Sequence, residues 1–349
     1  ENRTRWIVGA YAITTDRFIG TGAMVDTGAG VNPVFRAPRG NFPFDFATDS
    51  VNPQASFLAD SQDNFAWAVF GEVAHDVSDD FEVALSLRYD EDERKNTTET
   101  PTAFLPNVAG FPQGVTGQVR KNTWDDLQPK VSLRYFANED LTFYGGWSRG
   151  FRSGGFNQTG VGAVSFANGI TGVGDLFDQE TTETFEAGVK GVFYDGQIRA
   201  NLSLFRTLAK GSYFFVFLAA NSTQNLGNLT EVEYQGLEFD LAINVAEGLD
   251  INFGLGITDS EVTDSTRASD IGDKASNVSD YTLNLGLAYS RPTNLFGGAD
   301  FFFRTDYQII GPTAFYDGQQ DDTNDREAVQ LLDVRTGLQL ADSWALTLW

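Results

Sequence analysis

The 349-residue sequence contains no cysteine and a single histidine. The missing cysteines exclude disulfides and thiolate metal sites, and they argue against a disulfide-stapled extracellular domain. No apolar run approaches the roughly 18 residues that mark a transmembrane helix. Positive charge is also scarce, since 24 Lys and Arg face 48 Asp and Glu and the net charge is −24. Because nucleic-acid phosphates require a basic surface, the sequence predicts no nucleic-acid partner.

What the sequence does contain is a recurrent alternation of apolar residues with small or polar ones. The segments 141–147, 237–245, 251–258 and 281–289 all show this alternation. Successive side chains of a strand point to opposite faces of a sheet, so each segment predicts a β-strand with one apolar and one polar face. A soluble barrel or sandwich would show the same pattern, so alternation alone leaves that interpretation open.

The connections between these strands alternate between two lengths. Short connections with turn-forming residues occur at 78–80, 138–140, 194–197, 247–250 and 341–343, and long polar or glycine-rich stretches occur at 17–63, 97–121, 153–178, 259–276 and 311–327. Two connections fit less well, because 218–227 is short for a long loop and 290–299 is long for a short turn. Outer-membrane β-barrels have short periplasmic turns and long extracellular loops in this order.

We therefore predict an all-β fold, an antiparallel transmembrane β-barrel of which this chain supplies about thirteen strands. The predicted strands are 5–16, 64–77, 80–96, 122–137, 141–152, 180–194, 197–217, 228–246, 250–259, 277–290, 299–310, 328–341 and 343–349. With the apolar face toward lipid, the luminal face would carry Glu82, Arg88, Arg134, Glu186, Lys190, Arg199, Glu238, Asp240, Arg304, Asp306, Asp333 and Arg335. Aromatic residues beside the short turns, such as Phe81, Tyr135 and Phe143, favour an interfacial girdle.

Several stretches resemble the barrel of TonB-dependent outer-membrane receptors. They are 124–135 and 140–157, which includes Ser-Arg-Gly-Phe-Arg-Ser-Gly-Gly-Phe-Asn, then 179–190 and 195–205. Segment 225–240 resembles the strand in which such receptors carry an Asn-x-Gly…Gly-x-Glu pattern, and 344–349 looks like the start of their penultimate strand. The resemblance covers nearly the whole chain from about residue 60 onward.

The resemblance implies a barrel of about 22 strands, with an N-terminal plug domain and a final strand that these 349 residues do not include. We therefore expect 1–349 to be one barrel domain, the C-terminal part of a plugged receptor in the outer membrane of a Gram-negative bacterium. The implied function is import of a scarce substrate, such as a ferric siderophore. The implied partners are the TonB–ExbB–ExbD energy-transducing complex, outer-membrane lipid and lipopolysaccharide.

Arg149, Phe151, Arg152 and Phe156 are the candidate ligand contacts, because they lie where a predicted strand meets a long loop. A cationic and aromatic cluster suits an anionic ferric chelate. The alternative is that these residues are barrel structure, with the arginines paired to luminal carboxylates. The acidic stretches 259–280 and 321–325 match no defined calcium loop, so we predict no metal site, no cofactor and no catalytic residue.

Two other functions are compatible with parts of the pattern. A passive diffusion porin would share the girdles and the loop asymmetry, but not the ordered motifs. An outer-membrane hydrolase would need a serine nucleophile within reach of a histidine. His75 is the one histidine, and the alternation places it on the lipid side near a short turn, so we expect a structural histidine.

Overall fold

The computed structural model describes residues 3–24, 54–218, 223–315, 325–341 and 344–349. The predicted turn at 341–343, the acidic stretch 321–325 and the predicted loops 17–63, 218–227 and 311–327 therefore lie partly outside the described residues. Within them the chain is dominated by strands, and thirteen strands form one antiparallel sheet in which each strand pairs with the next of these thirteen along the chain. The predicted all-β, antiparallel fold is confirmed.

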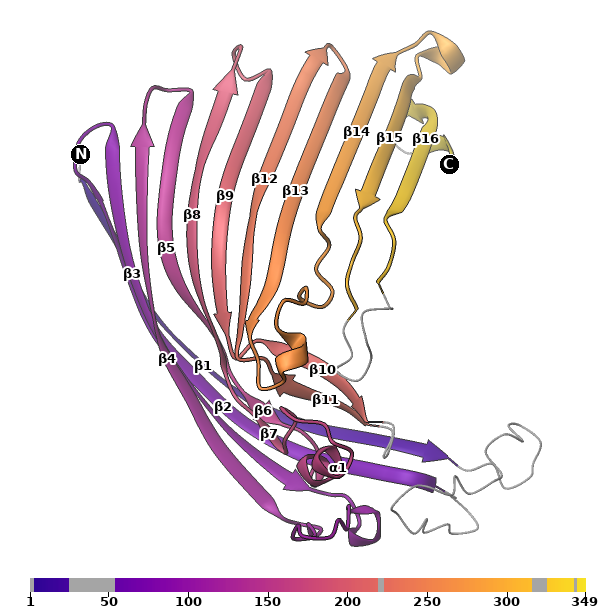
Figure 1. The fold of residues 1–349 in the computed structure, drawn as a ribbon. Helices are drawn as coiled ribbons and strands as arrows, with labels where there is room; N and C mark the ends of the chain where they lie inside the picture. The colour runs from indigo at the N-terminus through magenta and orange to yellow at the C-terminus, as the bar shows by residue number, and fades with distance from the viewer. Residues whose placement is uncertain (1–2, 25–53, 219–222, 316–324, 342–343) are drawn as a thin grey trace.

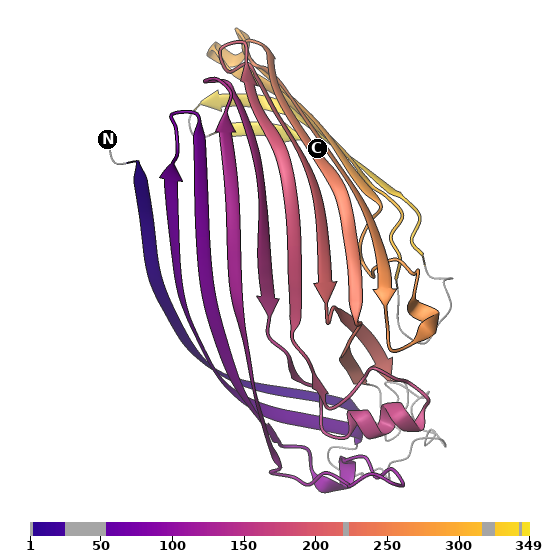
Figure 2. The same cartoon turned by 60° about the vertical axis from the view of Figure 1, so that its left-hand side comes forward.

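The sheet contains β1 (Thr4–Met24), β2 (Gln54–Asp76), β3 (Phe81–Thr98), β4 (Val119–Phe136), β5 (Leu141–Arg152), β8 (Glu180–Phe193), β9 (Ile198–Lys210), β12 (Glu231–Ala246), β13 (Leu249–Asp264), β14 (Tyr281–Pro292), β15 (Asp300–Ile310), β16 (Val329–Ala341) and β17 (Trp344–Leu348). It curves into a wall that is open in the described part of the chain, with β1 and β17 at its edges (Figures 1 and 2). The fold is thus a partial transmembrane β-barrel.

The remaining elements lie at the long-loop end of the wall. They are two small sheets, β6 (Gly155–Phe156) with β7 (Leu176–Phe177) and β10 (Tyr213–Leu218) with β11 (Thr223–Asn228), the helix α1 (Val161–Ala167), and the 3-10 turns Thr102–Phe104 and Ala268–Asp270. A third 3-10 turn, Leu295–Gly297, lies in the longer turn 290–299 at the other end. None of the helices in the described ranges has the length and apolarity to span a membrane.

The sequence prediction was wrong about the strand 197–217. Strand β9 ends at Lys210, and Gly211 follows with a φ of +67°. A Cβ atom at Gly211 would lie 2.5 Å from the carbonyl oxygen of Gln179, so this break suits glycine alone. Beyond the break, β10 leaves the wall and pairs with β11. The connection from β9 to β12 is consequently a long one, and the predicted loop 218–227 contains most of β11, the second strand of this hairpin.

Strands β1 and β2 also extend further than predicted. Their pairing runs from Thr4 opposite His75 to Met24 opposite Gln54, whereas the prediction ended at residue 16 and began again at 64. The added part includes Ser61, Gln62 and Asp63, which lack the apolar alternation. Backbone pairing continues through this polar stretch, and the apolar residues beyond it, such as Leu58 and Ala59, are adjacent rather than alternating, so periodicity did not reveal this part.

The two faces of the wall differ in chemistry as predicted. On the apolar face, large side chains such as Trp6, Phe185 and Leu204 are 73%, 58% and 55% exposed. On the luminal face, register places Glu82 opposite Arg134, and Arg304 opposite Arg335 with Asp306 beside them. In the described part of the wall, large apolar side chains are therefore mostly exposed on one face rather than gathered in a core. A hydrophobic core lies instead among the loops, built from α1, β10 and the ends of β12 and β13.

Candidate functional site

The candidate site lies at the long-loop end, where β4 and β5 separate. Their hydrogen-bonded ladder stops at the pair Lys130–Ser148, next to Pro129, which has no backbone N–H to donate. Beyond this point the free edge of β4 is covered by the loop 153–179. Gln179 donates to the carbonyl oxygen of Asp125 at 3.3 Å, and Arg120 donates to the carbonyl oxygen of Asp175 at 2.9 Å.

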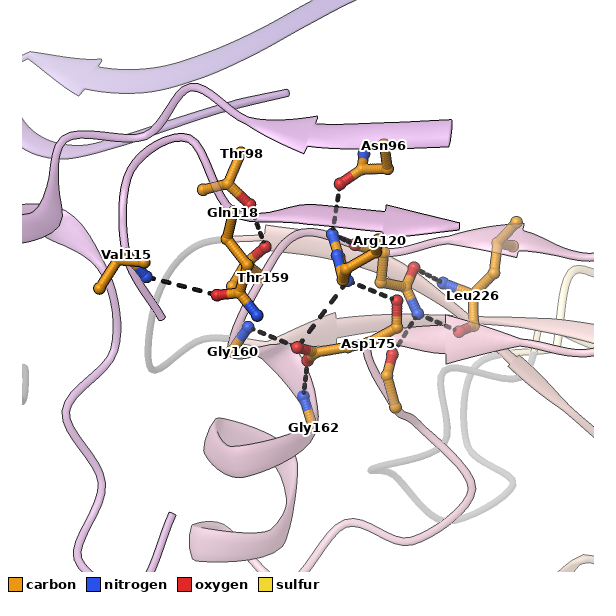
Figure 3. A network of polar contacts seen from close by, with 12 residues as sticks. Asn96, Thr98, Val115, Gln118, Arg120, Thr159, Gly160, Gly162, Asp175 and Leu226 are labelled. Carbon is orange, nitrogen blue, oxygen red and sulfur yellow. Dashed lines mark hydrogen bonds and ion pairs between the residues drawn. The ribbon is translucent and has the colours of Figure 1, made fainter. Parts of the chain in front are cut away.

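Arg120 of β4 is the centre of this region (Figure 3). Its guanidinium donates to the side-chain oxygen of Asn96 at 2.7 Å and to the carbonyl oxygen of Asn157 at 2.9 Å, and it lies 3.8 Å from the Asp175 carboxylate. The ring of Phe156 lies 5.2 Å from the guanidinium carbon. The side chain is only 14% exposed. Burial lowers the pKa of Arg120, while Asp175 and Asp60 oppose that effect.

Asp175 and Asn157 connect the loop to its neighbours. The Asp175 carboxylate accepts from the backbone N–H groups of Gly160 and Gly162 at 2.9 and 2.8 Å, beside the start of α1. The Asn157 amide donates to the carbonyl oxygen of Leu226 at 2.7 Å and accepts from the Leu226 N–H at 3.0 Å. Arg120 thus holds one loop segment against the wall, and Asn157 fastens that segment to the β10–β11 hairpin.

The Gly-Gly-Phe-Asn sequence at 154–157 is explained by close packing. A Cβ atom at Gly154 would lie 2.5 Å from both the Trp124 indole nitrogen and the Phe177 carbonyl oxygen. One at Gly155 would lie 2.5 Å from the Phe177 ring. Trp124 is 4% exposed and packs edge-on against Phe156 at 5.9 Å. The two glycines therefore let the chain pass over Trp124.

Asp60 is a second buried charge at this end of the wall. It lies at the long-loop end of β2, where it pairs in register with Thr98, the last residue of β3, and so outside the membrane-spanning part. The side chain is 3% exposed, and Oδ1 lacks a hydrogen-bond partner within the described residues. Burial raises the pKa of Asp60 to about 6, against the opposing charge of Arg120 and a contact with Asn96.

The four predicted contact residues fall into two groups. Arg152 and Phe156 lie at the mouth: Arg152 pairs with Glu180 at 3.0 Å and stacks on Tyr213 at 3.9 Å, and Phe156 packs between Trp124 and Arg120. Arg149 and Phe151 alternate with Arg152 along β5, and they pair with Glu183 and Thr181 of β8. Arg152 and Phe156 therefore have different partners at the mouth, and both Arg149 and Phe151 lie on the other face of β5 from Arg152.

Arg149 bridges the gap where β4 and β5 part. It donates to both carboxylate oxygens of Asp126, at 2.8 and 2.7 Å, and lies 3.8 Å from Glu183. The two hydrogen bonds to Asp126 stabilise the charged form of the Arg149 guanidinium. They also occupy two of its donors. This geometry agrees with the alternative interpretation given above, in which the arginine is part of the barrel structure and pairs with a carboxylate.

Sequence reasoning did not identify Arg120, Asp60 or Tyr213 as members of the site. Tyr213 donates its hydroxyl to the Ser153 carbonyl oxygen at 2.6 Å, and burial raises its pKa to about 12. Arg120 lies in the predicted loop 97–121, two residues before the predicted strand 122–137, so no strand pattern marked it. The partners of Asp60 and Tyr213 lie far away in the sequence, so no local pattern marked them.

Further down the luminal face the wall is hollowed between β4 and β8. The hollow is lined by the charged and polar side chains of Lys130, Arg134, Tyr144, Glu186 and Lys190, and also by Gly146. On the opposite face, Val8, Val73 and Leu87 line an apolar groove at the neighbouring strands. One side of the wall can therefore solvate polar solutes while the other meets hydrocarbon.

His75 lies on the same face of β2 as Val73, the apolar face, near the turn between β2 and β3. Its Nδ1 atom lies 2.9 Å from the Thr4 hydroxyl oxygen. Within the described ranges no serine hydroxyl is bonded to this ring, so the structure gives it no nucleophile to activate.

Comparison with known proteins gives one family. The family model for the TonB-dependent receptor-like β-barrel matches residues 3–349. Among solved structures, the ferric yersiniabactin uptake receptor FyuA from Yersinia pestis aligns with a TM-score of 0.72 at 16% identity, and the siderophore receptor PiuA from Acinetobacter baumannii with 0.67 at 16%. The copper transporter OprC aligns with 0.67 at 13%. Each match covers 99% of this chain but only 45%, 48% and 48% of the solved chain, respectively.

Proposed function

Because the chain belongs to the TonB-dependent receptor β-barrel family, we propose that it forms part of an outer-membrane receptor that imports a scarce substrate with energy supplied through TonB. The single observation that carries this proposal is the family match across 3–349. The wall supports it, because a polar luminal face and an apolar outer face suit a conduit through lipid. We propose that 1–349 acts as one barrel domain, in the outer membrane of a Gram-negative bacterium.

The proposed cargo is a ferric siderophore or a similar chelate. By name, FyuA is a ferric yersiniabactin uptake receptor, PiuA is a siderophore receptor and OprC is a copper transporter. At 13–16% identity these likenesses concern the fold, so the cargo is our inference from the family and from the cationic and aromatic side chains at the mouth. Arg152 and Phe156 stay the favoured ligand contacts, and Arg149 and Phe151 are retained as predictions.

The proposed partners follow from the same family. One partner is the TonB–ExbB–ExbD complex, which receptors of this family contact through their N-terminal plug region. The others are the lipid and lipopolysaccharide around the wall. Nucleic acid is not a proposed partner, since the chain carries a net charge of −24. We propose transport and no enzymatic activity.

Iron uptake by the full-length receptor tests this function. Cells that lack the receptor gene should grow poorly on a chelated iron source, and the full-length gene should restore growth only when TonB is present. Restored growth that is equal without TonB would point to a passive porin. A hydrolase would be indicated by lipase activity of the purified receptor that disappears in His75→Ala.

A further inference from the structure

The β10–β11 hairpin has two unlike faces. Phe214, Val216 and Leu218 alternate along β10 on the face that is packed, with 4%, 0% and 1% exposure. Phe215 and Phe217 occupy the other face, and each is 46% exposed. A strand inserted into a loop region thus buries one apolar row and displays a second one.

The direction of the displayed row follows from what the packed row touches. The packed side chains contact Val161 and Val164 of α1 together with Val232 and Val262 at the ends of β12 and β13. Val232 lies on the same face of β12 as Glu238, which is the luminal face. The hairpin therefore packs against the inner side of the wall. Its other face begins at Tyr213, which contacts Arg152 at the end of β5, and is exposed further along the hairpin at Phe215 and Phe217. Figures 1 and 2 place the hairpin beyond the ends of β9 and β12, beside α1.

The hairpin is held in place before any ligand arrives. Asn157 binds the backbone of Leu226, and Asn228 donates to the carbonyl oxygens of Gly211 and Asp178 at 2.8 and 3.0 Å. The N–H of Leu229 donates to the Ser212 carbonyl oxygen at 2.7 Å. Such a fixed scaffold presents its side chains with little ordering left to occur on binding, which favours affinity.

A cation lies at one end of the displayed row. Tyr213 precedes Phe215 and Phe217 at the same two-residue spacing, and the Arg152 guanidinium lies 3.9 Å from its ring centroid. Arg152 also pairs with Glu180, yet its side chain is 56% exposed and can still face a solute. The Phe177 ring packs edge-on against Tyr213 at 5.2 Å. The face thus combines a solvent-accessible guanidinium with two exposed rings spaced by about 7 Å.

We propose that Phe215 and Phe217 bind the planar aromatic rings of an anionic ligand whose charge faces Arg152. This inference rests on the proposed function and narrows its cargo to chelates that carry aryl groups. Offset or edge-on contacts of aromatic pairs add to the burial of the rings themselves. A guanidinium at one end attracts the negative charge of the chelate. Chelates without rings would leave both phenylalanines exposed to water, so the surface discriminates against them.

The test uses the full-length receptor and two anionic iron complexes, ferric 2,3-dihydroxybenzoate, which has rings, and ferric citrate, which has none. The double variant Phe215→Leu/Phe217→Leu keeps an apolar strand and removes both rings. We expect it to bind the aryl complex roughly tenfold more weakly than the wild type. The matched control is Phe166→Leu, because Phe166 is a loop phenylalanine with 71% exposure that lies on α1; it should leave affinity unchanged.

The outcomes separate this inference from the function beneath it. Tighter binding of the aryl complex, lost in the double variant and kept in Phe166→Leu, supports the inference. Equal or tighter binding of ferric citrate, or an unchanged double variant, overturns it and leaves TonB-dependent import standing. An equal loss in Phe166→Leu also overturns it, because the effect would then belong to the loops in general. Heat-modifiable migration on gels checks that each variant forms a barrel.

Discussion

The wall and the loop region are stabilised in opposite ways. In the wall, large apolar side chains such as Leu204 and Phe185 are more than half exposed, and strands are joined by backbone ladders. In the loop region, Val161, Val216 and Val232 are fully buried in a common core. The wall therefore depends on lipid for its apolar contacts, whereas the loops carry a core like that of a soluble domain.

This difference matters for function. Loops without a core of their own would have to order themselves around each ligand, and the ordering entropy would weaken binding. Here Arg120, Asp175 and Asn157 fix the loop 153–179 to the wall and to the hairpin. The mouth of the lumen is thus a formed surface, with Arg152 and the exposed phenylalanines on it.

The comparison is tested most strongly by a matched pair of phenylalanines. Phe214→Ala empties part of the loop core, where the ring is 4% exposed, and should cost about 3–5 kcal/mol of loop stability. Phe185→Ala removes a ring that is 58% exposed on the apolar face, so no cavity forms and the cost in detergent should be small. Hydrogen exchange of the β10–β11 amides in the full-length receptor measures the effect. Similar exchange in both variants would mean that the loops have no separate core.

A matched pair of arginines tests the polar half of the comparison. Arg120→Met leaves Asp175 and Asn96 without their buried cation, and should destabilise the loop 153–179 by about 3 kcal/mol. Arg206→Met removes a bidentate pair with Glu233 on the surface, where Arg206 is 64% exposed, and should cost less than about 1 kcal/mol. Limited proteolysis of the full-length receptor reads out the loop. Equal resistance of the two variants would remove Arg120 from its central role.

The sequence predicts the wall well because the alternation of apolar and polar residues along a strand can be read from neighbouring residues alone. Strand β5 has the predicted bounds, and the predicted luminal charges share one register, as in the pairs Glu82–Arg134 and Arg304–Arg335. The loop region depends on contacts between distant segments, such as Asn157 with Leu226. No periodicity encodes such contacts. For this reason the prediction ran β9 into β10 without the break at Gly211, and it named Phe156 but missed the arginine beneath its ring.

The smallest expected effect concerns the pH dependence of the loop region. Asp60 has a pKa of about 6 in the folded chain against an ordinary value of 3.8, so the folded state binds its proton more tightly than the unfolded state. With respect to this group, stability should therefore be highest below about pH 4, near the ordinary pKa, and it should fall as the pH rises through about 6.

Between pH 5 and pH 7.5 the expected loss is about 1 kcal/mol. Asp60→Asn cannot ionise and should flatten this part of the profile, as measured by thermal unfolding of the full-length receptor at both values. Asp63→Asn is the control, because Asp63 lies on the same strand but is 52% exposed and pairs with Lys95. It should keep the wild-type slope. The two aspartates differ in burial and not in charge, so the control isolates the effect of burial. A pH slope that survives in Asp60→Asn would contradict the prediction and would show that another buried group near Arg120 titrates in this range.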